Sequence, residues 1–165
     1  MARRDATGPV TLSVLDRLID RDPKNSSEVP FTRAQSLREL RLGLKRDLEW
    51  LLNTRRTINP APDSARETVR SVYQYGFEDI SSKSVLSGRD QSELVRDMES
   101  VIAIFEPRLK RAKVRMEPVV TNYRSLKFVI EGLLCMDPAP EPVRFDTVLE
   151  LGKGEYEIKG ADRAQ

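Results

Sequence analysis

The residues best suited to recognition or chemistry stand in the stretch Glu106-Pro107-Arg108, where an acid and an arginine flank a proline. Pro107 has no N–H and disfavours the α region for Glu106, so a helix that arrives here has to end. The backbone then presents two opposite charges at a rigid corner. An exposed ion pair contributes at most about 1 kcal/mol to stability, so the residues alone are consistent with either a solvated corner or a binding site.

Hydrolytic chemistry would have to use carboxylates, Lys, Tyr or one thiol, because the chain contains no histidine. A glycosidase needs two carboxyl groups across a cleft, about 5–5.5 Å apart for retention or about 6.5–9.5 Å for inversion. Asp47 and Glu49 are two residues apart in a helical pattern and point to different sides. Glu28 and Glu106 have no evident partner. We therefore predict no catalytic residue, no cofactor and no metal site.

Composition limits the class of protein. The chain has 165 residues, the length of one domain, and its 28 Lys+Arg nearly match its 26 Asp+Glu. This balance disfavours a nucleic-acid binder. The single Cys135 excludes an internal disulfide, and its apolar neighbours predict a buried thiol in an intracellular protein. No apolar run approaches the ~18 residues that span a bilayer, so we expect a cytoplasmic protein without membrane insertion.

The first thirty residues predict an arm, a short amphipathic helix and a linker. Residues 1–10 are polar and broken by Gly8-Pro9. Leucines then recur at helical spacing from Thr11, the expected N-cap, to about Arg21. Residues 22–30 are rich in Pro, Ser and Asn and read as a linker. The helix either packs on its own domain or docks on a partner, and the sequence favours neither.

Longer helices follow. Thr32 and Gln35 have the spacing of a capping box, and the helix that they open carries leucines every three or four residues. Gly43 in this helix predicts close packing against it, and Trp50 is expected to be buried or half-buried. A shorter helix over residues 65–73 ends at Gly76. Another begins at Asp90, the expected N-cap, and ends at the Glu-Pro-Arg corner.

After the corner the apolar period changes to two, which is typical of strands. Four strands are predicted around residues 112–117, 126–131, 143–151 and 156–158, with a connection around Tyr123. The fold class is therefore α+β, with N-terminal helices followed by a mostly antiparallel C-terminal sheet. Residues 31–160 form one domain, and residues 161–165 are a polar tail. The last hairpin is expected at a sheet edge that another strand can join, through Val148, Glu150, Tyr156 and Ile158.

Several stretches together resemble the baseplate subunit TssE of the type VI secretion system, in the superfamily of the lysozyme-like wedge protein of phage tail baseplates. The stretches are Leu15-Asp16-Arg17-Leu18, residues 46–56 (RDLEWLLNTRR), Tyr75-Gly76 and residues 105–109 (FEPRL). The resemblance runs from about Leu12 to Ile158, and residues 47–56 are its most specific part, since amphipathicity alone would not dictate Asn-Thr-Arg-Arg after the leucines.

The resemblance implies a structural protein of a phage tail-like machine. It implies that the chain joins the wedge complex, with TssF and TssG as wedge partners and TssK nearby, to the contractile TssB/TssC sheath and helps start sheath polymerisation. The baseplate would be docked at the inner-membrane complex. The implied wedge-binding residues are Glu106, Pro107, Arg108, Leu15, Asp16, Arg17 and Leu18.

Two alternatives stay open. The lysozyme-like label makes a peptidoglycan-acting glycosidase the competing enzyme class, and a generic adaptor that binds partner helices through residues 12–19 needs no sheath contact. We expect Arg108→Glu to leave the domain folded but to abolish wedge assembly. Deleting the terminal hairpin is expected to stop sheath growth while sparing the wedge. For Arg55 and Arg56, stabilisation of a helix C-terminus and partner contact are nearly equal explanations.

Overall fold

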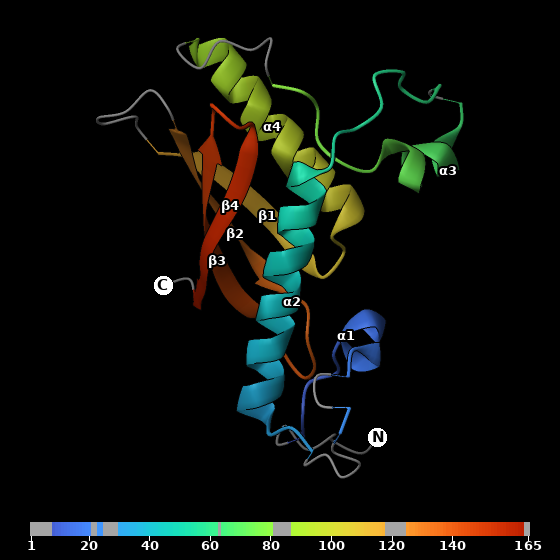
Figure 1. The fold of residues 1–165 in the computed structure, drawn as a ribbon, viewed down its shortest axis with the longest axis vertical. Helices are drawn as coiled ribbons and strands as arrows, with labels where there is room; N and C mark the ends of the chain where they lie inside the picture. The colour runs from blue at the N-terminus through green and yellow to red at the C-terminus, as the bar shows by residue number, and fades with distance from the viewer. Residues whose placement is uncertain are drawn as a thin grey trace.

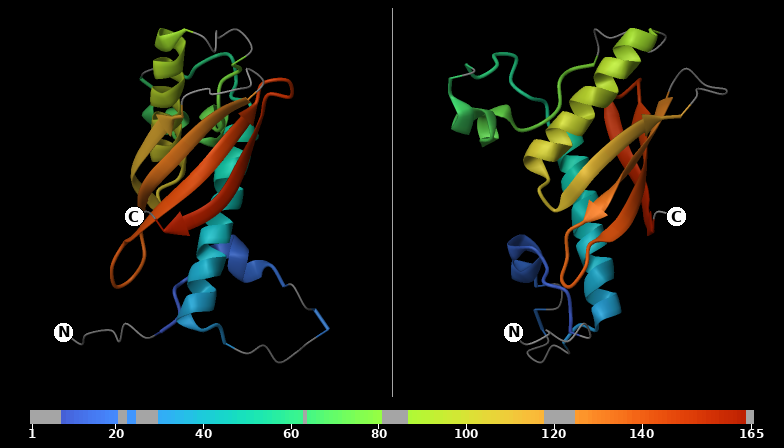
Figure 2. Two further views of the ribbon diagram at one scale, coloured as in Figure 1. Left: turned by 90° about the vertical axis from the view of Figure 1, so that its left-hand side faces the viewer. Right: turned by 180° about the vertical axis from the view of Figure 1, so that it is seen from behind.

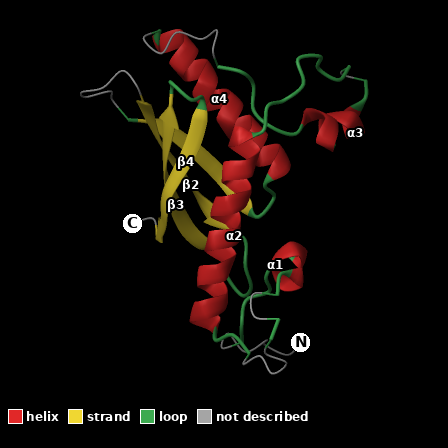
Figure 3. Cartoon of the chain, viewed as in Figure 1, coloured by secondary structure: helices red, strands yellow, loops and turns green. Residues whose placement is uncertain are grey.

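The computed structural model of the chain describes residues 8–20, 23–24, 30–62, 64–80, 87–117 and 125–163. Helices come first and strands second, and a four-stranded antiparallel sheet packs against two long helices (Figures 1 and 3). The predicted α+β class is thus confirmed. Glu28 and the connection around Tyr123 lie outside the described residues.

Helix α2, Arg33–Asn53, is continuous and begins at the predicted capping box. The Gln35 N–H donates to Thr32 Oγ1 at 3.3 Å, and the Thr32 N–H donates to Gln35 Oε1 at 2.9 Å. Because these two bonds satisfy donors that a helix start leaves free, they fix where α2 begins. One face of α2 is buried, and its core residues are Leu40, Leu44, Leu48, Leu51 and Leu52.

Helix α4, Gly88–Phe105, starts earlier than predicted. Ser87, not Asp90, is the N-cap, because its side-chain oxygen accepts from the Asp90 N–H at 3.3 Å. The helix ends at Phe105 as Pro107 requires, and Glu106 leaves the helical conformation with φ −118° and ψ 75°. Its buried face consists of Leu94, Met98, Val101 and Ile102.

The sheet is a meander in the order β1-β2-β3-β4, in which each strand pairs with the next in the chain. The strands are β1 Leu109–Met116, β2 Ser125–Leu134, β3 Glu141–Glu150 and β4 Glu155–Arg163. Helices α2 and α4 lie on one face of it, and the left view of Figure 2 looks onto the other face. The inner face carries the aromatic and aliphatic core, with Phe128, Phe145, Leu149 and Ile158 almost completely buried. Strand β4 runs to Arg163, so the predicted polar tail begins inside a strand.

The short elements differ from their predictions. Helix α1 is only Val14–Leu18 and is capped by Ser13 instead of Thr11, because the Ser13 hydroxyl accepts from the Asp16 N–H. The single helix predicted over residues 65–73 is split into α3, Arg66–Val69, and the 3-10 helix η1, Val72–Gln74.

Three burial predictions also change. Cys135 is exposed, because it directly follows the inward-facing Leu134 at the end of β2 and so faces away from the core. Trp50 is 53% exposed and lies outside the core, with the Arg46 guanidinium 5.0 Å from its ring centre. Residues 8–10 are not a loose arm, since Val10 is buried and its N–H donates to Ser36 Oγ at 2.9 Å.

Candidate functional site

The Glu-Pro-Arg corner connects α4 to β1, and its two charged residues face each other. Glu106 is only 5% exposed. The Arg108 side chain folds back over the corner, where Nε donates to Glu106 Oε1 at 2.7 Å and Nη2 donates to Oε2 at 2.5 Å. This bidentate geometry is the strongest form of a carboxylate–guanidinium contact. The acid and the arginine are therefore not a pair of free charges on the surface.

Arg108 also ties the corner to α2. Its Nη2 donates to Asp47 Oδ2 at 2.6 Å, although the two residues are 61 positions apart. The second Asp47 oxygen, Oδ1, accepts from Arg46 Nε at 2.9 Å. Acid and base thus alternate from the corner into the middle of α2, and all four oxygens of Glu106 and Asp47 face a guanidinium group.

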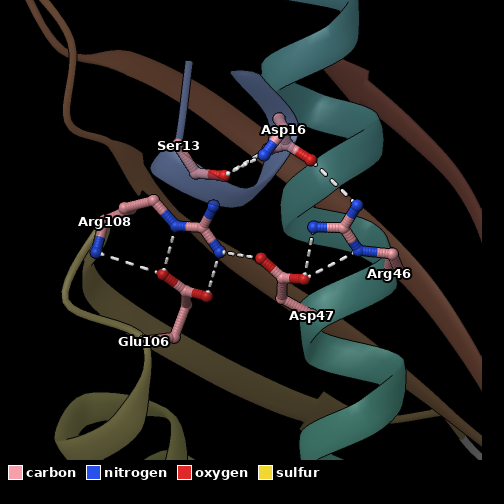
Figure 4. Close-up of polar contacts among 6 residues, drawn as sticks. All are labelled: Ser13, Asp16, Arg46, Asp47, Glu106 and Arg108. Carbon is pink, nitrogen blue, oxygen red and sulfur yellow. Dashed lines mark hydrogen bonds and ion pairs between the residues drawn. The ribbon is translucent and has the colours of Figure 1, made fainter. Parts of the chain in front are cut away.

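The same chain of contacts continues to α1 (Figure 4). Arg46 Nη1 donates to Asp16 Oδ1 at 2.8 Å, and the Ser13 hydroxyl donates to Asp16 Oδ2 at 2.5 Å. Gly43 makes room for this contact, since a Cβ there would lie 2.7 Å from Asp16 Oδ2. The close packing predicted at Gly43 is confirmed. We call the connected set the acid–arginine network; it consists of Ser13, Asp16, Arg46, Asp47, Glu106 and Arg108.

The network shifts the pKa values of Arg108 and Asp16, and of the neighbouring Tyr75. Hydrogen bonds and charge from Glu106, reinforced by Asp47, raise the pKa of Arg108 although burial opposes this. Burial would raise the pKa of Asp16, but the Ser13 hydrogen bond and Arg46 lower it below 3.8. Burial, with the Asp47 and Glu106 charges, raises the pKa of Tyr75 above 10.0. Both pKa shifts within the network therefore favour the charged forms of Arg108 and Asp16.

A hollow of about 360 Å³ opens beside the network. Its walls are largely apolar, with the Tyr75 and Phe105 rings edge to face at 5.3 Å between centres. The lining residues are Ser13, Leu15, Asp47, Leu51, Tyr75, Phe105, Glu106, Pro107 and Arg108. Helix α1 stands next to it with no buried residue of its own. Helix α1 and its C-cap residue Ile19 present four exposed apolar side chains, which we call the α1 apolar face: Val14, Leu15, Leu18 and Ile19.

The two segments predicted separately as wedge-binding residues thus form one surface. Asp16 belongs to the network and Leu15 lines the hollow, while Arg17 and Leu18 are exposed outside both. Ser13, Arg46 and Asp47 were not among the predicted site residues. Arg46 opens the stretch 46–56 that carries the resemblance, and Asp47 opens its most specific part, so a signal for both was present in the sequence.

The predicted edge residues divide into two groups. Val148 and Glu150 lie in β3, where Val148 opposes Lys127 on one side and Glu157 on the other, so their prediction as edge residues is wrong. The period-two pattern does not reveal which strand of the last hairpin is outermost. Tyr156 and Ile158 do lie in the outer strand β4, but their side chains are 5% and 1% exposed and face the core.

Arg55 and Arg56 hold a loop instead of the end of a helix. Helix α2 ends at Asn53, and Arg55 forms an isolated parallel bridge with Phe77. Arg55 Nη1 lies 2.8 Å from Asp79 Oδ2, and Arg56 Nη2 lies 3.9 Å from Glu78 Oε2. Neither arginine belongs to the acid–arginine network, and both ion pairs are within the chain.

Two features are not found in the part of the chain that the structure describes. No group of three or more Cys, Asp or Glu side chains is placed to hold a metal ion there. Within the same ranges, no helix combines the length and hydropathy needed to cross a bilayer.

Comparison with known proteins gives one family. The sequence profile of baseplate wedge protein gp25 matches residues 38–139, more than half of the 165 residues. This match contains α2 from Arg38 onward, the corner and the larger part of the acid–arginine network. No curated protein and no solved structure matched the chain. On the profile match, together with the order of helices and antiparallel strands, the chain belongs to the family of baseplate wedge protein gp25.

Proposed function

We propose that this chain is the gp25-like wedge subunit of a type VI secretion baseplate, and that it binds its wedge partners through one surface made of the α1 apolar face and the hollow. The observation that carries the proposal is the acid–arginine network, which connects α1, α2 and the Glu-Pro-Arg corner. Because the network satisfies its own charges, the contacts left to a partner are mainly apolar. The partners are TssF and TssG, with TssK nearby.

The structure changes the choice of variant for testing this surface. Arg108→Glu would place a third carboxylate against Glu106 and Asp47, so it is expected to unfold the corner and is no longer a clean test of binding. Leu18 is better suited because it is 76% exposed and makes no contact in the core. Val72 in η1 is 89% exposed and provides a matched control. It follows α3, which lies well away from α1 in Figures 1 and 2.

The test is co-expression with TssF and TssG from the same source, followed by size-exclusion chromatography. We expect the unchanged chain and Val72→Glu to co-elute with both partners, and Leu18→Glu to elute alone. Circular dichroism should give the same fold for all three chains. Co-elution of Leu18→Glu as efficiently as Val72→Glu would contradict the proposed surface, and separation of the unchanged chain would contradict the baseplate assignment.

The contact with the TssB/TssC sheath is the second part of the proposal, and it uses the C-terminal sheet. Deleting the terminal hairpin would remove Tyr156 and Ile158 from the core, so loss of sheath growth would then report unfolding. A location in the baseplate at the inner-membrane complex follows from the same proposal.

Glycosidase activity is disfavoured by the geometry. Glu106 and Asp47 line the hollow, but every oxygen of their carboxyl groups already accepts from a guanidinium group, which leaves none of the four to act on a substrate. Purified cell wall is therefore expected to keep its turbidity when mixed with the protein. A fall in turbidity that Glu106→Gln abolishes would reverse this conclusion.

A further inference from the structure

The outer edge of β4 is covered by two side chains of α2. The Tyr156 N–H donates to Asn53 Oδ1 at 2.8 Å, and Asn53 Nδ2 donates back to the Tyr156 carbonyl at 2.9 Å. The Ile158 N–H donates to Glu49 Oε1 at 2.9 Å. These amides point away from β3, so they are the groups with which an added strand would pair.

The spacing of the two capping residues matches the strand. Glu49 and Asn53 are four positions apart in a helix, a rise of about 6 Å. Tyr156 and Ile158 are two positions apart in a strand, a rise of about 6.8 Å. One face of α2 can therefore satisfy successive outward amides of β4 much as a neighbouring strand would. The Asn53 side-chain amide pairs with both backbone groups of Tyr156, since its oxygen accepts from the N–H and its nitrogen donates to the carbonyl.

The opposite edge of the sheet has the same kind of cover. The Val114 N–H of β1 donates to Glu99 Oε1 of α4 at 2.9 Å. Both outer strands of the order β1-β2-β3-β4 are thus capped by a carboxylate or amide from one of the two long helices. Unpaired edge amides are templates for association with other chains, and here part of each edge is already occupied.

We propose that Glu49 and Asn53 act as a releasable cap on β4, which keeps the edge closed in the free protein and must give way before a strand from another chain can pair there. The cap is made only of side chains, so its release does not require α2 to unfold. An incoming strand offers a carbonyl to each of the two N–H groups and an N–H to the Tyr156 carbonyl, so it replaces the lost bonds in kind. The proposal rests on the proposed function only for the identity of that strand, which would come from the sheath.

The experiment compares the unchanged chain with Glu49→Ala/Asn53→Ala, and uses Glu49→Gln as the control because Gln keeps an oxygen that can accept from Ile158. Amide exchange of Tyr156 and Ile158 is measured by NMR at low protein concentration. We expect exchange at Ile158 to accelerate about tenfold or more in the double variant, since the lost acceptor is charged, and by less at Tyr156. Glu49→Gln should stay within about threefold of the unchanged chain.

The second measurement is sedimentation of the same proteins over a range of concentrations. The opened edge should make the double variant self-associate while the unchanged chain and Glu49→Gln remain monomeric, and the two amides should regain protection as the dimer forms. Equal exchange in all three proteins, or a double variant that stays monomeric at millimolar concentration, would overturn the cap. No wedge or sheath partner is present, so failure here is distinct from failure of the baseplate assignment.

Discussion

Replacement of Arg108 by methionine tests whether the acid–arginine network stabilises the fold. The substitution keeps most of the aliphatic length but removes the guanidinium that Glu106 and Asp47 share. Removing one partner from a buried ion pair costs about 3–5 kcal/mol. Glu106 is 6% exposed at its side chain, but Arg108 and Asp47 are 24% and 23% exposed, so water reaches part of the site. We therefore expect Arg108→Met to lower the free energy of unfolding by about 2–4 kcal/mol, which corresponds to a fall in Tm of roughly 4–16 °C for a chain of this size.

Urea unfolding, followed by fluorescence of the single tryptophan, measures this loss. Arg55→Met is the matched control, because the Arg55–Asp79 pair has side chains that are 72% and 47% exposed and should lose at most about 1 kcal/mol. Adding Glu106→Gln to Arg108→Met should restore about 1–2 kcal/mol of the lost free energy of unfolding, because it removes one unpaired charge. If Arg108→Met and Arg55→Met lose the same free energy within about 0.5 kcal/mol, the network does not act as a partly buried charge cluster.

Three further predictions concern single positions. Gly43→Ala should raise the helix propensity of α2 by up to about 1 kcal/mol but push Asp16 off Arg46, and because the two effects oppose each other we expect Tm to change little while the NMR shifts of α1 change. Gly88→Ala, with open space around its Cβ, should leave the α1 shifts as they are. Because the pKa of Asp16 is lowered below 3.8, its bonds stabilise the fold above that pH, and this stabilisation is lost as the pH falls through and below 3.8. Arg46 contacts both Asp16 and the Trp50 ring, so Trp50 fluorescence should change over that range, and Asp16→Asn should abolish the change. Gly76→Ala should lower the free energy of unfolding by about 2–4 kcal/mol, because Gly76 has φ +109° and a Cβ there would lie 2.3 Å from the Thr54 oxygen. Gly154→Ala, at φ +68° with free space, should lower it by about 1–2 kcal/mol in the same urea assay.

The fold was predictable where one local signal decided the structure. The leucine spacing and the capping box at Thr32 and Gln35 gave α2 its start, and Pro107 set the end of α4. Helix starts were wrong at Thr11 and Asp90 because two possible caps stood close together in each case, and Ser13 and Ser87 supply the capping oxygen. Which of two neighbouring residues becomes the N-cap depends on the backbone conformation of a single residue, and the spacing of apolar residues does not determine it.

The candidate site was predictable only in part. Asp16, Glu106 and Arg108 were recognised from their motifs, but the sequence gives no means to place Asp47 against Arg108 across 61 positions. The edge was predicted as a hairpin, yet Val148 and Glu150 occupy its inner strand. Cys135 was misjudged from apolar neighbours in sequence, because its exposure depends on where β2 ends and thus on strand parity. Pairing across the chain and parity at strand ends are properties of the assembled sheet.

The meander gives the cap on β4 a fixed place in the order of folding. Each strand of the sheet pairs with its neighbour in the chain, so these contacts can form as synthesis proceeds from the N-terminus. Asn53 and Glu49, by contrast, meet residues 103 and 109 positions later. Such distant contacts carry the largest loop-closure cost and form slowly. Helix α2 therefore leaves the ribosome long before the edge that it covers. At the end of that interval, after β3 has emerged and before β4 has followed it, β3 is the outermost strand, with its own outward amides unpaired.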